Sequence, residues 1–331
     1  MMKSVILLLF CVLGLGWVAP ERAHAEPPFS GTIFLDPDII LDPDPTTFTN
    51  LVEAGQDMRR MFDRRVNDWV SLNAFLFNAR YSDGLAIEIQ VNPEFGERAD
   101  ALAQASRFAP VIGQLPTCLR VDVQTVWIHK GIQPFGGGNH NLLIHTGQAD
   151  EYAASGILEE TFVHEATHTS LDAAHAGAKG WAAAQSADDT FISTYARDYP
   201  GREDLAESFL LYMALRHRSN RISATLSNTI SRTIPNRITY LDGLDLEMNP
   251  IVSPARPRAT GFIYDSKVGI VGLSWTSRWS AHYAVEVSTD LATWDALGGN
   301  VMSQGSSTHF LFPDSLPRTR AFFVVREIIG Q

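Results

Sequence analysis

The stretch His164-Glu165-Ala166-Thr167-His168 sets the interpretation of the whole chain. On an α-helix, residues four apart lie on one face about one turn apart, so both imidazoles can reach one metal ion. Glu165 then points beside the metal, where it can accept a proton from a metal-activated water. The spacing therefore predicts a metal centre with His164 and His168 as ligands and Glu165 as general base.

The sequence around this motif favours a buried helix. Residues 155–175 have the pattern of one uninterrupted helix, which Gly177 and Gly180 would end. Its apolar faces come from Ile157, Leu158, Phe162, Val163 and Leu171. The alternative is a solvated helix face that holds two histidines by chance. Burying histidines and a glutamate together is costly unless they are paired or bind metal, so the context favours a metal site.

A catalytic zinc site needs a third protein ligand and an open position. His175 is a poor candidate, because it follows His168 by seven residues where the metzincin pattern requires six, and Leu171 stands where that pattern has glycine. We interpret His175 as a polar residue near a helix end. Asp172 lies one turn after His168 on the same face, and is better placed to orient an imidazole or to cap the helix than to bind metal.

The remaining candidates lie in residues 195–212. Pro200 favours a helix start there, and Glu203 suits the first turn. Glu203 and Glu207 are four apart and share a face, and Ala206 would allow another helix to approach closely. One carboxylate as ligand and a second as support for a histidine is a common arrangement around metals. Either acid alone could equally belong to a solvated helix face.

The motif H-E-x-x-H followed by Y-A and then E-D-x-A-E resembles secreted zinc metallopeptidases of the gluzincin type, and is similar to the anthrax lethal factor-like group. The resemblance covers residues 157–216. It implies Glu203 as the third zinc ligand and Glu207 as the support of a ligand histidine. In that group a tyrosine seven residues before the ligand glutamate stabilises the oxyanion. Tyr195 lies eight residues before Glu203, so it departs by one, and Tyr199 is the alternative.

The first 25 residues predict export. Lys3 provides a positive start, an apolar run extends to Val18, and Ala23-His24-Ala25 matches a signal-peptidase site with cleavage after Ala25. The run is too short to span a bilayer comfortably, so we expect a secreted or periplasmic protein with no membrane insertion after cleavage. Cleavage would leave Cys118 as the single cysteine, which excludes an intrachain disulfide.

The chain is acidic, with a formal net charge of −11. Lys3, Glu21 and Arg22 give the predicted signal peptide a net charge of +1, so cleavage takes the remainder to −12. An acidic chain without a basic run is not expected to bind nucleic acid or anionic membrane surfaces.

The rest of residues 26–248 predicts an α+β domain. Residues 26–45 should form an extended lead with a short strand, and residues 50–77 have a helical pattern. Residues 101–109 should be helical, with Asp100 as N-cap and Pro110 as stop. Strands are expected at 85–91, 121–129 and 141–145. Residues 134–139 lack a phosphate-loop lysine and are interpreted as a flexible connector.

Gluzincin-type enzymes bind substrate along the strand before the zinc helix, and residues 142–146 are the candidate for that strand. His145 within it could face the cleft, but it fits a surface or core histidine better. After residue 218 a helical stretch should run to about 234.

Residues 249–257 are proline-rich and predict a linker. Beyond them, strands expected at 260–264, 270–275, 282–288, 309–312 and 321–327 predict a small antiparallel β-sandwich over 258–331, which resembles fibronectin III-like modules. Trp275 and Trp294 are more typical of a core than of a carbohydrate platform.

These observations predict a zincin-like metallopeptidase domain, followed by the sandwich as an accessory domain that could bind a surface or polymer. Zn²⁺ is the expected cofactor and a protein or peptide the expected substrate. The alternative is a secreted binding or adhesive protein whose metal site is structural or inactive. A structural site would have four protein ligands, and would have no use for a base at Glu165.

Overall fold

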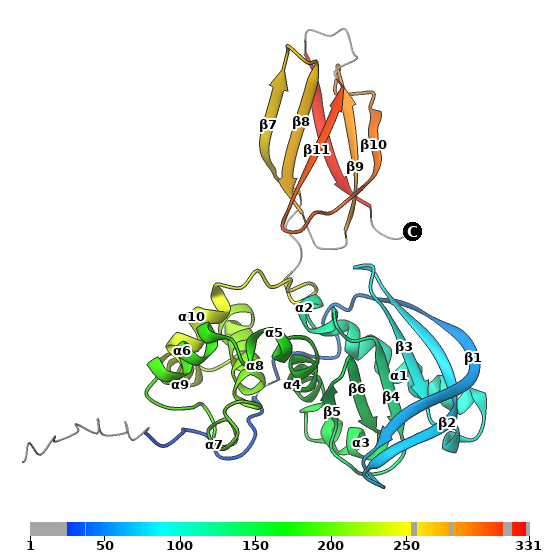
Figure 1. The fold of residues 1–331 in the computed structure, drawn as a ribbon, viewed down its shortest axis with the longest axis vertical. Helices are drawn as coiled ribbons and strands as arrows, with labels where there is room; N and C mark the ends of the chain where they lie inside the picture. Colours follow the sequence, from blue (N-terminus) through cyan, green and yellow to red (C-terminus); the bar gives the residue numbers. More distant parts are fainter. Residues whose placement is uncertain (1–24, 37, 253–256, 278–280, 314–319, 329–331) are drawn as a thin grey trace, which may run out of the picture.

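A computed structural model describes residues 25–36, 38–252, 257–277, 281–313 and 320–328. The predicted signal peptide therefore lies almost entirely outside the described residues. The described part has a mixed α+β fold, with one six-stranded sheet covered by helices and two three-stranded sheets nearer the C-terminus (Figure 1). None of its helices is long and apolar enough to cross a membrane.

The large sheet has the strand order β1-β2-β3-β4-β6-β5. Its strands are β1 (Phe48–Asp63), β2 (Asp68–Tyr81), β3 (Ala86–Val91), β4 (Thr125–His129), β5 (Gly136–Gly138) and β6 (Asn141–His145). Strands β3, β4 and β6 are parallel to one another, and the other pairs are antiparallel. The predictions for 85–91 and 141–145 are confirmed, and the one for 121–129 holds only from Thr125 onward.

The helix expected over residues 50–77 is wrong, because this region is the long hairpin of β1 and β2. The turn between them places Asn67 in the left-handed region, with φ of 52°. Alternate residues of β2 then face opposite sides of the sheet. Leu76 belongs to one apolar cluster and Phe77 to another. Both faces of this strand are therefore partly apolar, which hides the alternation that would have identified it.

The helices around the sheet depart from prediction mainly at their ends. They are α1 (Arg98–Gln114), α2 (Thr117–Arg120), α3 (Thr146–Ala154), α4 (Leu158–Ser170), α5 (Asp172–His175), α6 (Lys179–Ala187), α7 (Thr194–Asp198), α8 (Asp204–His217), α9 (Ala224–Thr233) and α10 (Pro235–Asp242), with the short 3₁₀ turns η1 (Pro93–Phe95) and η2 (Ser219–Arg221). Pro110 lies inside α1, which continues past it and buries Ile112. Helical structure after residue 218 extends to Asp242 rather than 234.

The single helix expected over residues 155–175 is divided. Gly156 has φ of +69°, so α4 begins only after it, at Leu158. At the other end Leu171 departs from helical geometry, and Asp172 starts the separate short helix α5. The motif of residues 164–168 lies entirely within α4, which contacts α8 and β5.

The described part of the chain has two large hydrophobic cores and a small cluster around Leu76. The larger extends from Ile33 to Ile251 in sequence and includes the inner faces of the large sheet, α1, α4 and α8. The smaller lies between the sheets β10-β9-β12 and β11-β8-β7, around Trp275 and Tyr283. The linker predicted at 249–257 begins too early, because Asn249 and Ile251 are buried with the larger core, and residues 253–256 lie outside the described residues.

The C-terminal strands are β7 (Ala259–Asp265), β8 (Ile270–Thr276), β9 (His282–Ser288), β10 (Asp295–Met302), β11 (Ser307–Pro313) and β12 (Phe322–Glu327). Strand β10 was not predicted, because Gly298 and Gly299 interrupt its alternation. Trp275 is a core residue as expected, with 1% of its surface exposed, whereas Trp294 is only half-buried.

Candidate metal centre

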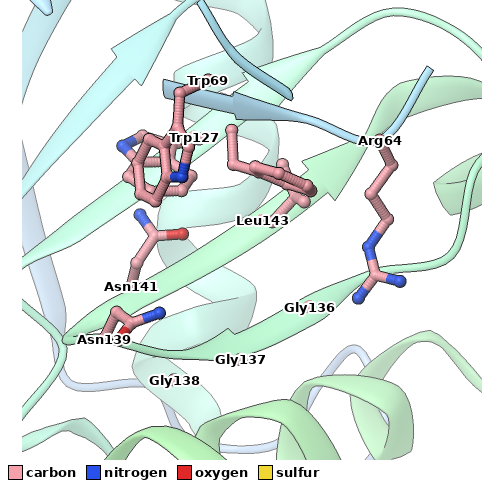
Figure 2. A pocket seen from close by; sticks show the side chains of 10 residues that line it. Arg64, Trp69, Trp127, Gly136, Gly137, Gly138, Asn139, Asn141 and Leu143 are labelled. Carbon is pink, nitrogen blue, oxygen red and sulfur yellow. The ribbon is translucent and has the colours of Figure 1, made fainter. Parts of the chain in front are cut away.

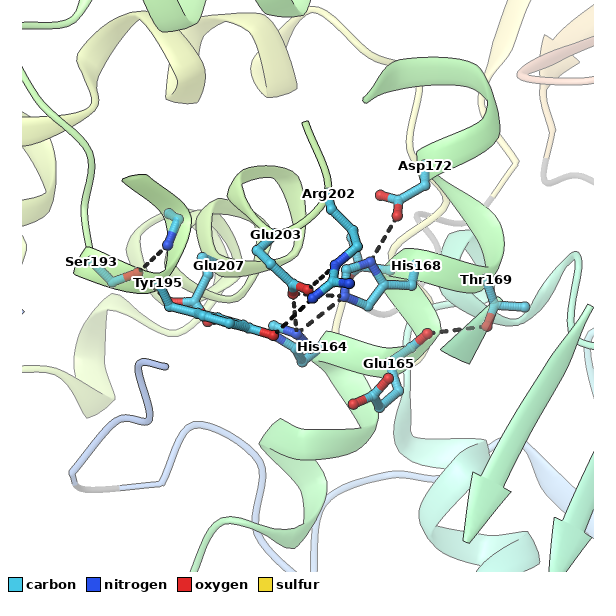
Figure 3. A network of polar contacts seen from close by, with 12 residues as sticks. His164, Glu165, His168, Thr169, Asp172, Ser193, Tyr195, Arg202, Glu203 and Glu207 are labelled. Carbon is cyan, nitrogen blue, oxygen red and sulfur yellow. Dashed lines mark hydrogen bonds and ion pairs between the residues drawn. The ribbon is translucent and has the colours of Figure 1, made fainter. Parts of the chain in front are cut away.

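Helix α4 and the start of α8 bring His164, His168 and Glu203 together (Figure 3). His164 Nε2 lies 3.2 Å from His168 Nε2, and Glu203 Oε2 lies 3.3 Å and 3.2 Å from these two nitrogens. A tetrahedral ion with bonds of about 2.0–2.1 Å separates its ligand atoms by about 3.3 Å. The donor set of two imidazoles and a carboxylate therefore fits a divalent metal ion.

Glu203 is held in place by backbone and side-chain contacts that precede α8. The segment from Tyr199 forms a turn, so α8 begins at Asp204 rather than at Pro200, and Glu203 N–H donates to Tyr199 O over 2.8 Å. Arg202 Nε donates to Glu203 Oε1 over 2.6 Å, which leaves Oε2 to face the histidines. Burial alone would raise the pKa of Glu203, but hydrogen bonds from His164, His168 and Arg202 outweigh it and hold the pKa far below its usual range.

A carboxylate supports each imidazole from behind. Asp172 Oδ2 lies 2.7 Å from His168 Nδ1, as expected for a residue that orients this ring. Glu207 Oε1 lies 3.6 Å from His164 Nδ1, which is close enough for an electrostatic contact but longer than a hydrogen bond. An acceptor beside Nδ1 favours the tautomer that leaves Nε2 free to bind metal. Both Nε2 atoms accordingly face Glu203.

Glu207 is itself fixed by two hydrogen bonds. It is fully buried, and its Oε2 accepts from Ser193 Oγ over 2.7 Å and from Ile33 N–H over 3.1 Å. Burial raises the pKa of Glu207, and these hydrogen bonds oppose that effect only in part. The backbone donor comes from the N-terminal lead, which the sequence analysis connected with no site. Because the lead has no recognisable motif, only the tertiary structure could show this contact.

Burial tends to lower the pKa of His168, but Asp172 and Glu203 overcome this effect and raise the pKa to about 10 in the metal-free protein. A metal ion must displace that proton, so binding releases it. The three carboxylates near the two rings provide negative charge that would balance a dication.

Glu165 lies in the same cavity as the three converging residues but is not one of them. The cavity has a volume of about 600 Å³ and is also lined by Asp172, Tyr195 and Arg202. Glu165 is half-buried, so its carboxylate remains accessible from the cavity. This is the placement expected of a base rather than of a ligand.

The structure places the two candidate tyrosines differently. Tyr195, in α7, lines the cavity, and its hydroxyl lies 3.5 Å from Arg202 Nη2. Tyr199 is 49% exposed and contacts the Tyr195 ring, at 5.3 Å between centroids. Burial raises the pKa of Tyr195, and the neighbouring charge of Glu203 raises it further, which keeps the hydroxyl protonated as a donor.

The glycine-rich segment before β6 is not the flexible connector that we expected. Gly136–Gly138 forms β5, the terminal strand of the sheet, beside α4. A Cβ at Gly137 would lie 1.8 Å from the Glu165 carbonyl oxygen, so no other residue fits there. Residues 142–146 are likewise not at the edge, because β6 lies between β4 and β5. The strand that borders the cleft is therefore β5.

The other histidines considered as site residues lie elsewhere. His145 is fully buried and its Nδ1 lies 2.9 Å from Lys130 O, in agreement with a core histidine. His175 Nδ1 lies 2.9 Å from the Tyr240 hydroxyl, away from the centre. Arg202 is the site residue that the sequence analysis missed, although its position directly before Glu203 could have suggested it.

Neither protein-family models nor curated proteins give a match to this chain. Among solved structures, it aligns with aminopeptidase A of Legionella pneumophila, determined in complex with aspartic acid, at 11% sequence identity and a TM-score of 0.25. The alignment covers 84% of this chain and 42% of that one, so this chain spans less than half of that protein. A likeness at this level carries no argument about fold or function, and the site must be interpreted from its own geometry.

Proposed function

We propose that this protein is an exported zinc-dependent peptidase with a zincin-like catalytic domain. The observation that carries the proposal is the convergence of His164 Nε2, His168 Nε2 and Glu203 Oε2 within 3.3 Å of one another, with Glu165 in the same cavity. Three ligands from a mixed nitrogen and oxygen set, together with a carboxylate that is not a ligand, are typical of catalytic zinc sites.

Zinc held by these residues would act as a Lewis acid and lower the pKa of a water towards about 7. Glu165 accepts the proton from that water and later passes it to the leaving amine. The Tyr195 hydroxyl donates to the oxyanion that develops on the peptide carbonyl. Arg202 holds Glu203, while Asp172 and Glu207 hold the two rings, so the groups need little rearrangement during the reaction.

A peptide substrate fits the shape of the site. Strand β5 ends the sheet beside α4, and an extended peptide can add to such an edge through main-chain hydrogen bonds. The C-terminal strands contribute no residue to the cavity that holds the metal ligands. We assign them an accessory role in binding a surface or polymer.

The test is metal analysis of the purified protein combined with hydrolysis of casein. We expect about one zinc per chain, loss of hydrolysis on treatment with a chelator, and recovery when zinc is restored. Bound zinc without hydrolysis of casein or of a peptide library would favour a binding protein with an inactive site. Protein that takes up no zinc would refute the proposal.

A further inference from the structure

A second cavity lies across β5 from the metal centre (Figure 2). It has a volume of about 290 Å³. Its walls include Phe62, Trp69, Trp127 and Leu143. Arg64, Gly137 and Gly138 line both this cavity and the one that contains Glu165. The two cavities therefore share part of their lining.

The wall of this second cavity is aromatic. Trp69 and Trp127 meet edge to face, with ring centroids 5.2 Å apart, and Phe62 packs against Trp69 at 5.7 Å. Trp69 remains 40% exposed in spite of these contacts. Aromatic side chains of this size usually bury most of their surface, and a partly exposed pair in a concave site is a suitable surface for an apolar side chain.

No side chain covers the floor of the cavity, because β5 consists of glycines. A Cβ at Gly136 would point to this side, 2.9 Å from Arg64 Nη2 and 3.5 Å from Leu143 Cβ. A Cβ at Gly137 would point to the opposite side, into the Glu165 carbonyl. Successive residues of β5 thus face the aromatic cavity and α4 in turn, as in any strand.

The free edge of β5 can also be identified. Thr169 Oγ1 accepts from Gly138 N–H over 2.8 Å and donates to Asn141 O over 2.9 Å, and Asn141 is the β6 residue opposite Gly138, so the Gly138 N–H points toward β6. Because successive N–H groups of a strand point to opposite edges, Gly136 also directs its N–H to β6, and Gly137 directs its N–H to the free edge. In a peptide paired there, the residue opposite Gly137 faces α4. The residue opposite Gly136 faces the aromatic cavity, since opposed residues share a face.

We propose that the cavity of Phe62, Trp69 and Trp127 is a specificity subsite that binds an aromatic or large aliphatic side chain of the substrate. The residue bound there is adjacent to one that faces the metal centre, because the two faces of β5 alternate. This inference rests on the proposed peptidase function, and it names the substrate class as extended peptides with a bulky apolar residue at that position.

The test uses the full-length zinc-loaded protein and pairs of blocked peptides that differ only by phenylalanine or alanine at one position, scanned along the peptide. For the wild type we expect one position at which the phenylalanine peptide has at least about tenfold higher kcat/KM. Trp69→Ala should remove part of the aromatic wall of the cavity, and Gly136→Val should fill its floor. Both variants should therefore bring the ratio of kcat/KM for the phenylalanine and alanine peptides close to one. Trp69→Phe should retain most of the preference. Trp294→Ala, in the C-terminal domain, is the matched control and should leave the ratio unchanged.

Equal kcat/KM for the two peptides at every position would overturn the subsite, and so would a preference that survives in both Trp69→Ala and Gly136→Val. If the wild type cleaves no peptide, the peptidase proposal fails, but the subsite is still tested by binding. Tryptophan fluorescence should then report tighter binding of the phenylalanine peptide, with the difference lost in Trp69→Ala. Equal affinities in that assay would reject the subsite independently.

Discussion

The two large hydrophobic cores of this protein differ most in the ionisable groups they bury. The larger core surrounds Arg120, Glu160, Glu203, Asp204, Glu207 and Arg237, each at most 4% exposed. In the described part of the C-terminal domain, the buried polar residues are Ser288 and Thr308, neither of which is charged. Burying a charge is expensive unless it is paired, so a core that retains several has a structural or chemical use for them.

Some of these buried charges serve the site indirectly. Arg237 lies 2.8 Å from both Asp188 and Asp204, and Asp204 directly follows Glu203. This buried ion-pair network ties the first turn of α8 to α10 and so fixes the backbone from which Glu203 extends. The proposed catalytic residues and the side chains that hold them in place therefore lie in the same, larger core. Substitutions in each part can test whether the C-terminal core is dispensable for the reaction.

The largest expected effect comes from Glu165→Gln. Because this variant removes a base but no ligand, kcat should fall by about 10²–10⁴-fold while bound zinc stays at the wild-type level. Metal analysis and peptide turnover on the same sample provide the measurement. Glu159→Gln, also in α4 but outside the cavity, is the control and should keep its activity. Loss of zinc from Glu165→Gln would show that the assigned role is wrong.

Glu203 and Glu207 are one turn apart in the chain but should respond differently to substitution. Glu203→Gln replaces the charged ligand carboxylate with a neutral amide and should release zinc on dialysis. Glu207→Gln only weakens the support of His164, so zinc affinity should fall by about 10–100-fold. A competition titration with a chelator distinguishes the two. If Glu207→Gln releases zinc and Glu203→Gln retains it, the ligand assignment is displaced by one turn.

Glu160 tests whether the larger core also buries an ionisable group with no role in the reaction. Its Oε2 accepts from Leu35 N–H over 2.7 Å, and burial raises its pKa from the usual 4.5 to about 8. The folded protein therefore binds a proton that the unfolded chain releases between these values. This contribution to stability is complete below about pH 4.5 and is lost as pH rises to about 8.

Glu160→Gln should consequently match the wild type near pH 4 and exceed it above pH 8, by a few kcal/mol in free energy of unfolding. Urea denaturation at several pH values measures the difference between the two proteins. A constant difference across this range would show that Glu160 has the same pKa in the folded and unfolded protein and that its burial has been compensated.

The sequence predicted the centre better than the sheet around it. His164, Glu165 and His168 are recognisable because one helix fixes their spacing, and Glu203 because it starts a second helix. The hairpin of β1 and β2 was missed, since pairing between Met61 and Val70 depends on a partner strand and not on local periodicity. The role of the glycines in β5 was hidden for a similar reason. Their lack of side chains matters only because α4 lies against Gly137.

The smallest expected effect is that of removing the C-terminal core altogether. Truncation at about residue 255 should leave zinc content and turnover of a soluble peptide unchanged. Every proposed ligand, base and support precedes Arg218, and the larger core ends at Ile251.

The two parts come together around a cavity of about 300 Å³ lined by Cys118 and Leu246 on one side and Gly305 on the other. Among the described elements, no helix or strand of the larger part packs extensively against the C-terminal strands, so few stabilising contacts would be lost. Retention on a surface or polymer should fall if the accessory role is correct. An insoluble or zinc-free truncated protein would show instead that the two cores depend on each other, and would reject the division on which the comparison rests.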